Sequence, residues 1–419
     1  MPRMDTMPAS SERVSPARIC AYRVLLRVFE DDAYADRAFR SAADSLALGA
    51  RDRALAQRLA YGSVQRVRTL DHAIETLGRR PVRKLDPPVR AALRLGAYQL
   101  GYTDVAAHAA ANESVELVRR AGLHRAVAFT NAVMRRLSEG VAPLLAALPD
   151  GPVKESYPDW IWDVWRRDLG DEQALALMRA QNEPPETVVR LVGGEPPPGA
   201  VPTELPDAYR VERIDETALA AGTVWPQSRG SQLAGLAVGA RAGERVLDLC
   251  AAPGGKATQL AARGARVTAV EIDPGRAREL RENVARLGAT TVSIVEADAT
   301  ALPPELAGYD RVLVDAPCSG LGVLARRPDL RWRARPLPEL QLALLRAAAD
   351  RVRPGGTVTY SVCTINTDEN EQVVDASGLE PLPLGDEWPT YRHPRHPEFL
   401  LTLPHVHGTS GFFVARLGV

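Results

Sequence analysis

The stretch that decides the fold is RVLDLCAAPGGKATQL, residues 245–260. Residues 245–249 alternate as a buried strand does, Pro253-Gly254-Gly255 predicts a tight turn, and residues 256–262 return to helical spacing. A strand, a glycine turn and a helix in this order begin a nucleotide-binding α/β sheet. The unpaired N–H groups at such a helix start can hold an anionic or polar group, and we expect Asp248 to orient the turn.

The ligand of this loop is better predicted as a ribose-containing cofactor than as a dinucleotide. The dinucleotide fingerprint is GxGxxG, whereas the loop reads CAAPGG and lacks the first glycine. The next predicted strand, residues 266–272, carries Glu271, which follows Asp248 by 23 residues (271 − 248). A carboxylate at this distance is placed to receive ribose hydroxyls. A packing turn without a ligand remains the alternative from the loop alone.

Length and composition predict a multidomain globular protein. A chain of 419 residues exceeds one typical core, and 45% hydrophobic with 25% charged residues is ordinary. The start, MPRMDTMPASSER, has no apolar run behind it, and no 18-residue apolar stretch occurs, so we expect a cytoplasmic protein without a membrane segment. The four cysteines lie far apart without CxxC, which favours free thiols over a metal site or disulfides. Nothing suggests an obligate oligomer, so a monomer is expected.

The net charge of zero is unevenly distributed. Residues 1–140 contain 23 Lys and Arg against 15 Asp and Glu, and the remainder contains 29 against 37. A basic block beside a cofactor-binding domain suits nucleic-acid binding, because phosphate contacts are largely electrostatic. A solvated helix surface is the alternative. If this region contacts RNA, the cluster Arg79, Arg80, Arg83 and Lys84 is the first place to look.

Apolar periodicity divides the chain into three predicted domains. Residues 1–140 read as an all-α bundle, with helices expected at 15–29, 51–67, 69–77, 88–100, 107–121 and 125–137. Residues 141–225 read as a small α+β connector, with helices at 160–167 and 171–182 and strands at 188–192 and 209–214. Residues 226–419 read as the cofactor domain, entered through a helix at 227–237.

The cofactor domain is predicted to hold a mostly parallel, Rossmann-like sheet with helices on both faces. After residue 272 the pattern gives a helix at 274–287, strands at 291–296 and 309–314, a helix at 338–352 and a strand at 357–362. A last strand at 411–417 is expected to run antiparallel at the sheet edge. Ligands of such sheets bind at the carboxyl ends of the strands, which is where these polar residues fall: Asp248, Glu271, Asp298, Asp315 and Cys363.

Two segments carry the candidate chemistry, DAPCSG at 315–320 and YSVCT at 360–364. Each places a cysteine at or just past the end of a strand, and the strands are neighbours, so both thiols are expected to face one pocket. A thiolate can add to an electron-poor ring carbon, and Lys256, one of only three lysines, would help to keep it ionised. Buried core cysteines are the alternative.

These motifs resemble a known family. LDLCAAPGGKATQLA, VEIDPGR, EADAT, DRVLVDAPCSGLGVLARRPDLRW and TYSVCTINTDENE are similar to motifs of the bacterial ribosomal RNA small subunit methyltransferase B family. Members of that family are S-adenosylmethionine-dependent RNA cytosine-C5 methyltransferases. The helical N-terminal part resembles the NusB-type RNA-binding domain that the family carries. The resemblance covers nearly the whole chain and implies a class I methyltransferase fold acting on RNA, with 16S ribosomal RNA as the expected partner.

The resemblance also implies residue roles. Cys363 would add to C6 of the cytosine, Asp315 would hydrogen-bond the base at N3 and N4, and Cys318 would help to remove the C5 proton. The cofactor would be held by these residues: Cys250, Ala251, Ala252, Pro253, Gly254, Gly255, Lys256, Glu271 on the ribose, Asp298 near the adenine, and partly Asp315. DNA cytosine methyltransferases use the cysteine of a Pro-Cys pair as nucleophile, which would nominate Cys318 instead.

Three departures from the family pattern and two other functions stay open. The residue before the expected nucleophile is Val362 where the family usually has Thr, and Ser228 and Ser410 stand where it often has Asp. Contacts at the edge of the substrate site are therefore expected to differ. A tRNA cytosine-C5 methyltransferase would share the catalytic motifs. A non-catalytic RNA-binding or assembly factor would need only the basic helical domain.

Overall fold

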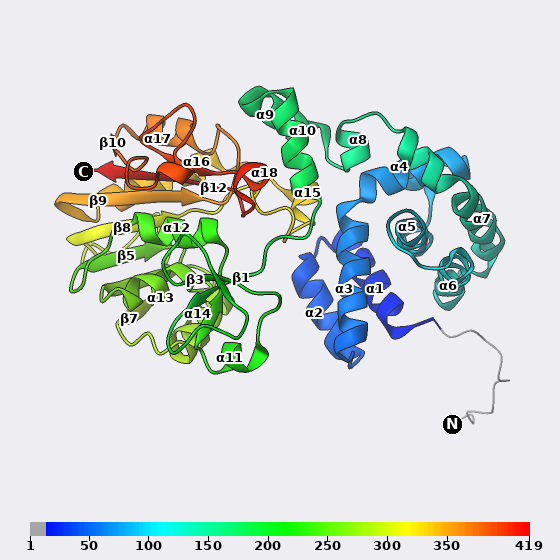
Figure 1. The fold of residues 1–419 in the computed structure, drawn as a ribbon, viewed down its shortest axis with the longest axis horizontal. Coiled ribbons are helices and arrows are strands. Elements are labelled where there is room, and N and C mark those ends of the chain that lie inside the picture. The colour runs from blue at the N-terminus through cyan, green and yellow to red at the C-terminus, as the bar shows by residue number, and fades with distance from the viewer. Residues whose placement is uncertain (1–13) are drawn as a thin grey trace. The chain divides into compact units, whose positions relative to one another are not determined.

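The computed structural model describes residues 14–419, and the prediction for the first thirteen residues lies outside that range. The described chain forms two compact units (Figure 1). The first contains the residues up to Asp163 together with Arg327–Arg333, and the second contains Val164–Arg326 and Ala334–Val419. No helix in the described range is long and apolar enough to cross a membrane.

The first unit is helical, as predicted. Its elements are α1 (Pro16–Glu30), α2 (Ala35–Ser45), α3 (Ala50–Gln65), α4 (Val67–Gly78), η1 (Val82–Lys84), α5 (Pro87–Tyr102), α6 (Ala107–Arg120), α7 (His124–Ala147) and α8 (Pro152–Glu155). Sequence analysis missed α2, whose apolar face is mostly alanine. It also ended α7 too early, because this helix continues past residue 137 through Pro143. The predicted domain boundary at residue 140 lies inside α7.

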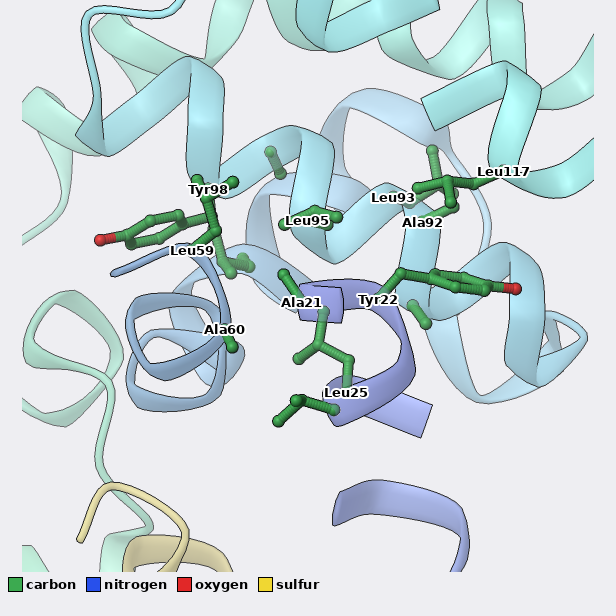
Figure 2. Packing of buried hydrophobic residues seen from close by; sticks show 14 of the residues in the cluster. Ala21, Tyr22, Leu25, Leu59, Ala60, Ala92, Leu93, Leu95, Tyr98 and Leu117 are labelled. Carbon is green, nitrogen blue, oxygen red and sulfur yellow. The ribbon is translucent and has the colours of Figure 1, made fainter. Parts of the chain in front are cut away.

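The core of the first unit surrounds α5, which contacts α1, α3, α4, α6 and α7 (Figure 1). In Figure 2, Leu93 and Leu95 of α5 point into the same apolar cluster as Leu25 of α1 and Leu59 of α3. Helical spacing places these side chains on the faces that meet. Ser15 is the N-cap residue of α1 and Pro16 lies in the first turn, but the Ser15 side chain donates to Glu113 Oε2 instead of capping the helix.

A short segment from the middle of the chain, Arg327–Arg333, completes this unit. It contains α15 (Leu330–Arg333), and the fully buried Arg331 guanidinium lies 3.9 Å from the ring centroid of Tyr157. Trp332 Nε1 donates to the carbonyl of Val64 at 2.7 Å. Sequence analysis did not predict this placement, because the segment follows the Cys318 motif within the predicted cofactor domain.

The second unit begins with a small α+β region. Helix α9 (Asp159–Leu169) begins in the first unit and ends in the second. It and α10 (Asp171–Ala180) precede a four-stranded antiparallel sheet in the order β2-β3-β1-β4. Its strands are β1 (Val188–Leu191), β2 (Val201–Pro202), β3 (Ala208–Arg210) and β4 (Val224–Pro226), with α11 (Glu216–Ala220) before β4. The two predicted strands correspond to β1 and β3, although β3 ends at Arg210 and not at residue 214, and β2 and β4 were missed.

The large sheet is Rossmann-like and mostly parallel, as predicted. Its order is β10-β12-β9-β8-β5-β6-β7, with β11 paired to β12. The parallel strands are β5 (Arg245–Leu249), β6 (Arg266–Glu271), β7 (Val292–Glu296), β8 (Tyr309–Asp315) and β9 (Val352–Val362). The helices of this unit are α12 (Arg229–Ala237), α13 (Gly255–Ala262), α14 (Pro274–Arg286), α16 (Pro338–Ala349), α17 (Glu371–Ser377) and α18 (Pro404–His407). The chain leaves β5 to one side for β6 and β7 and then crosses to the other for β8 and β9, so a switch point lies between β5 and β8.

The last strand, β12 (Phe412–Gly418), is antiparallel to β9, and the two lie side by side in Figure 1. The expectation that it forms the sheet edge is wrong. Two further short strands, β10 (Glu380–Leu382) and β11 (Leu400–Thr402), pair with it. Residues 413–415 and 417 are buried on both faces, because β12 is an inner strand of the sheet.

Shortening one core side chain tests the packing of the first unit. Leu59 is fully buried, so Leu59→Ala should lower the free energy of unfolding by about 2–5 kcal/mol. Leu340 of α16 is 40% exposed, and Leu340→Ala should change it by less than about 0.5 kcal/mol. Urea unfolding followed by circular dichroism measures both. Equal losses for the two variants would contradict this assignment of the core.

Candidate active site

The predicted site residues gather at the switch point of the large sheet. Asp248 is the penultimate residue of β5, Glu271 ends β6, Asp315 ends β8, and Cys363 directly follows β9. Because β5, β8 and β9 are parallel neighbours, their carboxyl ends open to one place.

A cavity of about 260 Å³ occupies this place. It brings together seven of the predicted site residues: Ala251, Ala252, Pro253, Gly255, Lys256, Asp315 and Cys363. Sequence analysis did not assign its other walls, which include Trp225 of β4, Val323 and Arg326 after the Cys318 motif, and Phe412 of β12. Trp225 and Phe412 offer apolar ring faces beside the charged groups, a combination suited to a flat heterocycle.

Lys256 and Asp315 form an ion pair across this cavity. Lys256 Nζ donates to Asp315 Oδ2 at 2.7 Å and lies 5.2 Å from the centroid of the Phe412 ring. The lysine side chain is 9% exposed and that of Asp315 is 31% exposed, so the carboxylate remains reachable from the cavity. Ser361 Oγ also donates to Asp315 Oδ1 at 3.3 Å. The pair fixes an acceptor beside the thiol of Cys363.

The two cysteines meet, as their positions in neighbouring strands predicted. Cys318 Sγ and Cys363 Sγ are 3.4 Å apart. The register of β8 and β9 pairs Asp315 with Ser361, which leaves each cysteine two or three residues beyond the paired ends. Gly322 N then donates to the carbonyl of Cys363 at 3.0 Å and fastens the Cys318 loop to the end of β9.

This contact shifts the pKa values of the two thiols in opposite directions. The hydrogen bond from Cys318 lowers the pKa of Cys363 below its usual value, against the opposing effects of burial and the charge of Asp315, while Lys256 adds a smaller lowering. The same hydrogen bond, together with burial, raises the pKa of Cys318. Of the two thiols, Cys363 is therefore the one that ionises more readily. Lys256 was expected to keep the thiolate ionised. It does lower the pKa of Cys363, but less than Cys318 does, and its ammonium group pairs with Asp315.

The loop between β5 and α13 has the shape of a cofactor cradle. Gly254 adopts φ +106°, where a side chain is strained, and a Cβ there would come within 2.7 Å of Leu280. Both carboxylate oxygens of the fully buried Asp248, and Oε2 of the nearly buried Glu271, have no hydrogen-bond partner among residues 14–419. The expectation that Asp248 orients the turn is therefore wrong, since its oxygens accept nothing from it. Burial raises the pKa of Asp248 well above its usual value.

Orphaned buried acceptors indicate that a ligand with several donors belongs here. The ammonium group and the ribose hydroxyls of S-adenosylmethionine supply such donors, so these residues fit this cofactor.

Four other predicted cofactor residues, Cys250, Gly254, Glu271 and Asp298, do not line the cavity. Cys250 has φ +63° within the loop, and burial raises its pKa to about 12, so it is an inert thiol. Asp298 is exposed and accepts from Thr300 N at 2.8 Å and Thr300 Oγ1 at 2.7 Å. Gly254 shapes the loop without facing the cavity, and Glu271 Oε1 accepts from Asp273 N at 3.0 Å.

The departures from the family pattern have structural counterparts. Val362 is fully buried in β9 and the hydroxyl of Thr364 lies 2.8 Å from Ser319 Oγ, away from the cavity. Ser228 caps α12 by accepting from Ser231 N. Ser410 lines the cavity.

Sequence analysis missed a buried arginine that supports the site. Arg190 of β1 is 3% exposed and donates to Gln227 Oε1 at 3.0 Å and Thr258 Oγ1 at 2.8 Å. Thr258 belongs to α13, the helix that carries Lys256, so Arg190 ties the small sheet to the cofactor loop. Burial lowers the pKa of Arg190 to about 10. An arginine in a short alternating strand gives no signal of this role.

Known proteins resemble the chain over most of its length. A family model described as 16S rRNA methyltransferase RsmB/F matches residues 236–418, and a NusB family model matches residues 15–139. A probable ribosomal RNA small subunit methyltransferase B of Synechocystis is 33% identical, over 96% of this chain and 99% of the relative. The Thermus thermophilus enzyme of that name is 38% identical, over 78% of each chain. The chain belongs to the ribosomal RNA small subunit methyltransferase B family.

As a member of this family, the protein is an S-adenosylmethionine-dependent RNA methyltransferase with a NusB-like domain. Solved structures show the same fold. PH0851 superimposes with a TM-score of 0.81 over 98% of this chain and all of its own, at 24% identity. NSun6 from Pyrococcus horikoshii superimposes with a TM-score of 0.56 over 63% of this chain and 98% of its own, at 21% identity. The three-domain division at residues 140 and 225 stays a prediction.

Removing the thiol of Cys318 should raise the pKa of Cys363, because the hydrogen bond that stabilises the thiolate is lost. In Cys318→Ala, the pH at which Cys363 becomes half-reactive toward iodoacetamide should move upward, with the alkylated peptide identified by mass spectrometry. Cys318→Ser is the matched control, since its hydroxyl can still donate and the shift should be smaller. An unchanged pH profile in Cys318→Ala would show that the contact does not set the ionisation of Cys363.

Proposed function

We propose that the protein methylates C5 of a cytosine in 16S ribosomal RNA through a covalent bond between Cys363 and C6 of the base. The observation that carries the proposal is the pair of thiols 3.4 Å apart, with one thiol lining the cavity that Lys256 and Asp315 share. C5 of cytosine is a weak nucleophile, and a thiolate that adds to C6 makes it reactive.

In the first half of the reaction, Cys363 is the nucleophile. Its Sγ forms a bond to C6, and the electron pair of the C5–C6 double bond moves onto C5 and the ring. Asp315 is placed to accept a hydrogen bond from the N4 amino group, while Lys256 holds that carboxylate in position. A base can reach this cavity only after it leaves its stack, which suits an enzyme that binds its RNA through a second domain.

The cofactor site supports the same reaction. S-adenosylmethionine, when bound, supplies the methyl group that C5 accepts. We propose that the loop residues Ala251, Ala252, Pro253 and Gly255 hold it with Lys256. The unpartnered oxygens of Asp248 would accept hydrogen bonds from it, together with Glu271 Oε2, which lies 3.5 Å from Arg276 Nη1. Asp298 and Cys250 stay as weaker candidates, since neither lines the cavity.

In the second half, Cys318 is the base. Once the sulfur of Cys363 is bonded to carbon, the largest cause that raised the pKa of Cys318 is gone, and its thiol can lose its proton to solvent. The Cys318 thiolate then takes the proton from C5, the C5–C6 double bond re-forms, and the bond between C6 and Cys363 breaks. Cys363 leaves as a thiolate and the pair again holds one proton, so the net products are the methylated base, S-adenosylhomocysteine and one proton in solution.

The roles of the two cysteines can be separated by substitution. With S-adenosylmethionine and unmodified 16S RNA, Cys318→Ala should accumulate an RNA–protein adduct on denaturing gels, because release needs the second thiol. Cys363→Ala should give neither adduct nor 5-methylcytosine by bisulfite sequencing, a loss of at least about 10⁴-fold typical for a missing nucleophile. An adduct that needs Cys318 and survives the loss of Cys363 would reverse the assignment.

The substrate itself has two candidates, and the same assay on tRNA distinguishes them. The NusB-like domain and the names of the relatives favour 16S ribosomal RNA. Methylation of tRNA alone would show that tRNA is the substrate and would leave the proposed chemistry unchanged. No methylation of either RNA by the wild-type protein would favour the non-catalytic assembly factor.

We also propose that the basic cluster of the helical unit contacts RNA. Arg79, Arg80, Arg83 and Lys84 are all exposed around η1, at the end of α4. Cationic side chains gathered on one turn suit phosphate contacts, which carry most of the salt-dependent affinity.

Neutralising two of these charges should weaken RNA binding. Arg83→Gln with Lys84→Gln should lower affinity and reduce the slope of log K against log salt by about 1 for each phosphate contact removed. Arg40→Gln with Arg51→Gln removes the same charge from exposed positions on the same unit and should leave the slope unchanged. Filter binding to 16S RNA at several salt concentrations measures both. Equal effects of the two pairs would indicate that net charge, and not this cluster, drives binding.

A further inference from the structure

We propose that Glu369 is a positioning residue that holds the loops of Cys318 and Cys363 together, so that each thiol stands at the distance its step requires. This inference rests on the proposed function, because it concerns the two cysteines of that reaction. Glu369 lies in the segment TDENE that follows Cys363, and it lines none of the cavities described above.

The carboxylate of Glu369 is fully buried and collects donors from several segments. Its Oε1 accepts from Ser319 N at 2.9 Å, Gln341 Nε2 at 2.9 Å and Leu337 N at 3.2 Å. Its Oε2 accepts from Ser319 Oγ and from Asn366 Nδ2 at 3.2 Å. A buried carboxylate with this many donors has one orientation, because every alternative leaves donors unsatisfied.

One of these donors, Ser319, is the immediate neighbour of a thiol and also contacts the neighbour of the other thiol. Ser319 follows Cys318 directly and gives Glu369 both its backbone and its side-chain hydrogen. Its hydroxyl also lies 2.8 Å from that of Thr364, which follows Cys363 directly. Glu369 therefore connects to one cysteine loop in two places and to the other through Ser319.

Both ends of this connection are fixed to the sheet and its covering helix. Tyr360 of β9 donates its hydroxyl to the carbonyl of Glu369 at 2.7 Å. Gln341 of α16 donates to the carbonyl of Pro317 at 2.9 Å as well as to Glu369. Pro317 and Ser319 of the Cys318 loop are thus held by Gln341 and by the carboxylate of Glu369, which are hydrogen-bonded to each other.

Glu369 also acts on the pKa of Cys318. The groups that donate to its carboxylate are the neutral side chains and backbone amides of Ser319, Leu337, Gln341 and Asn366. After the hydrogen bond with Cys363 and burial, the charge of Glu369 further raises the pKa of Cys318. Glu369 therefore favours the arrangement in which Cys318 keeps the shared proton and Cys363 is the thiolate.

Glu369→Gln tests the role because it keeps the shape and removes half of the acceptors. The amide nitrogen would face donors from Ser319 or Asn366, so the Cys318 loop should shift away from Cys363. Cys363 is additionally held by the end of β9, so adduct formation should survive better than release. Glu371→Gln is the matched control, since Glu371 is also buried and two residues away, but pairs with His393 at 2.8 Å instead of the cysteine loops.

The first readout is turnover on 16S RNA. Glu369→Gln should lower kcat by about 100-fold, as a misplacement of about 1 Å does, with KM for S-adenosylmethionine unchanged and with RNA–protein adduct accumulating. Glu371→Gln should turn over without adduct. Wild-type turnover in Glu369→Gln, or lost turnover without adduct in a folded protein, overturns the proposal.

The second readout does not depend on the reaction. The groups that act on Cys363 are Cys318, Asp315 and Lys256, of which Cys318 has the largest effect. If Glu369 aligns Cys318, Glu369→Gln should move the pH profile of Cys363 alkylation upward, toward that of Cys318→Ala. This result is expected even if the wild-type protein proves to methylate another RNA position, which would overturn only the proposed function. An unmoved profile overturns the role of Glu369.

A third variant covers the case in which Glu369→Gln does not fold. Ser319→Ala removes only the hydroxyl that joins Glu369 to Thr364, and should produce the same adduct accumulation to a smaller extent. Ser319→Ala with wild-type release and a wild-type alkylation profile would overturn the proposal.

Discussion

The contact between the thiols of Cys318 and Cys363 is the interaction on which the proposed chemistry depends. A thiol is a poor nucleophile and a thiolate a strong one, so the proposed reaction needs one sulfur that ionises readily. The second thiol, 3.4 Å away, lowers the pKa of Cys363 as a neutral donor. A cation in the same place would favour the nucleophile equally, but it could not later accept the C5 proton.

The fold produces this contact through strand order. Parallel pairing of β8 and β9 aligns Asp315 with Ser361, and the two motifs then extend from the same edge of the sheet. The crossover between β5 and β8 brings the cofactor loop to that edge, where Lys256 reaches Asp315. Buried polar groups fix the loops: Glu369 between the cysteines, and Arg190 behind α13. The reactive atoms thus stand on strand ends, and their spacing is fixed by side chains deeper in the unit.

Local pattern and chain order predicted much of this arrangement. The strand, turn and helix at residues 245–262, the parallel strands, and the meeting of Cys318 with Cys363 all follow from periodicity and the switch-point rule. Local pattern did not predict what depends on distant partners. Arg331 packs on Tyr157 in the helical unit, and β12 is an inner strand only because β10 and β11 reach it from elsewhere in the chain. The unpartnered oxygens of Asp248 are visible only once its surroundings are known.

The measurement that tests the central claim most directly is peptide mapping of the adduct trapped by Cys318→Ala. After nuclease and protease digestion, tandem mass spectrometry locates the sulfur that carries the nucleotide and shows whether the base has gained a methyl group. The account predicts a methylated cytidine bound to the peptide that contains Cys363. A nucleotide bound to any other residue, or an unmethylated base on Cys363 in the presence of the methyl donor, would contradict it.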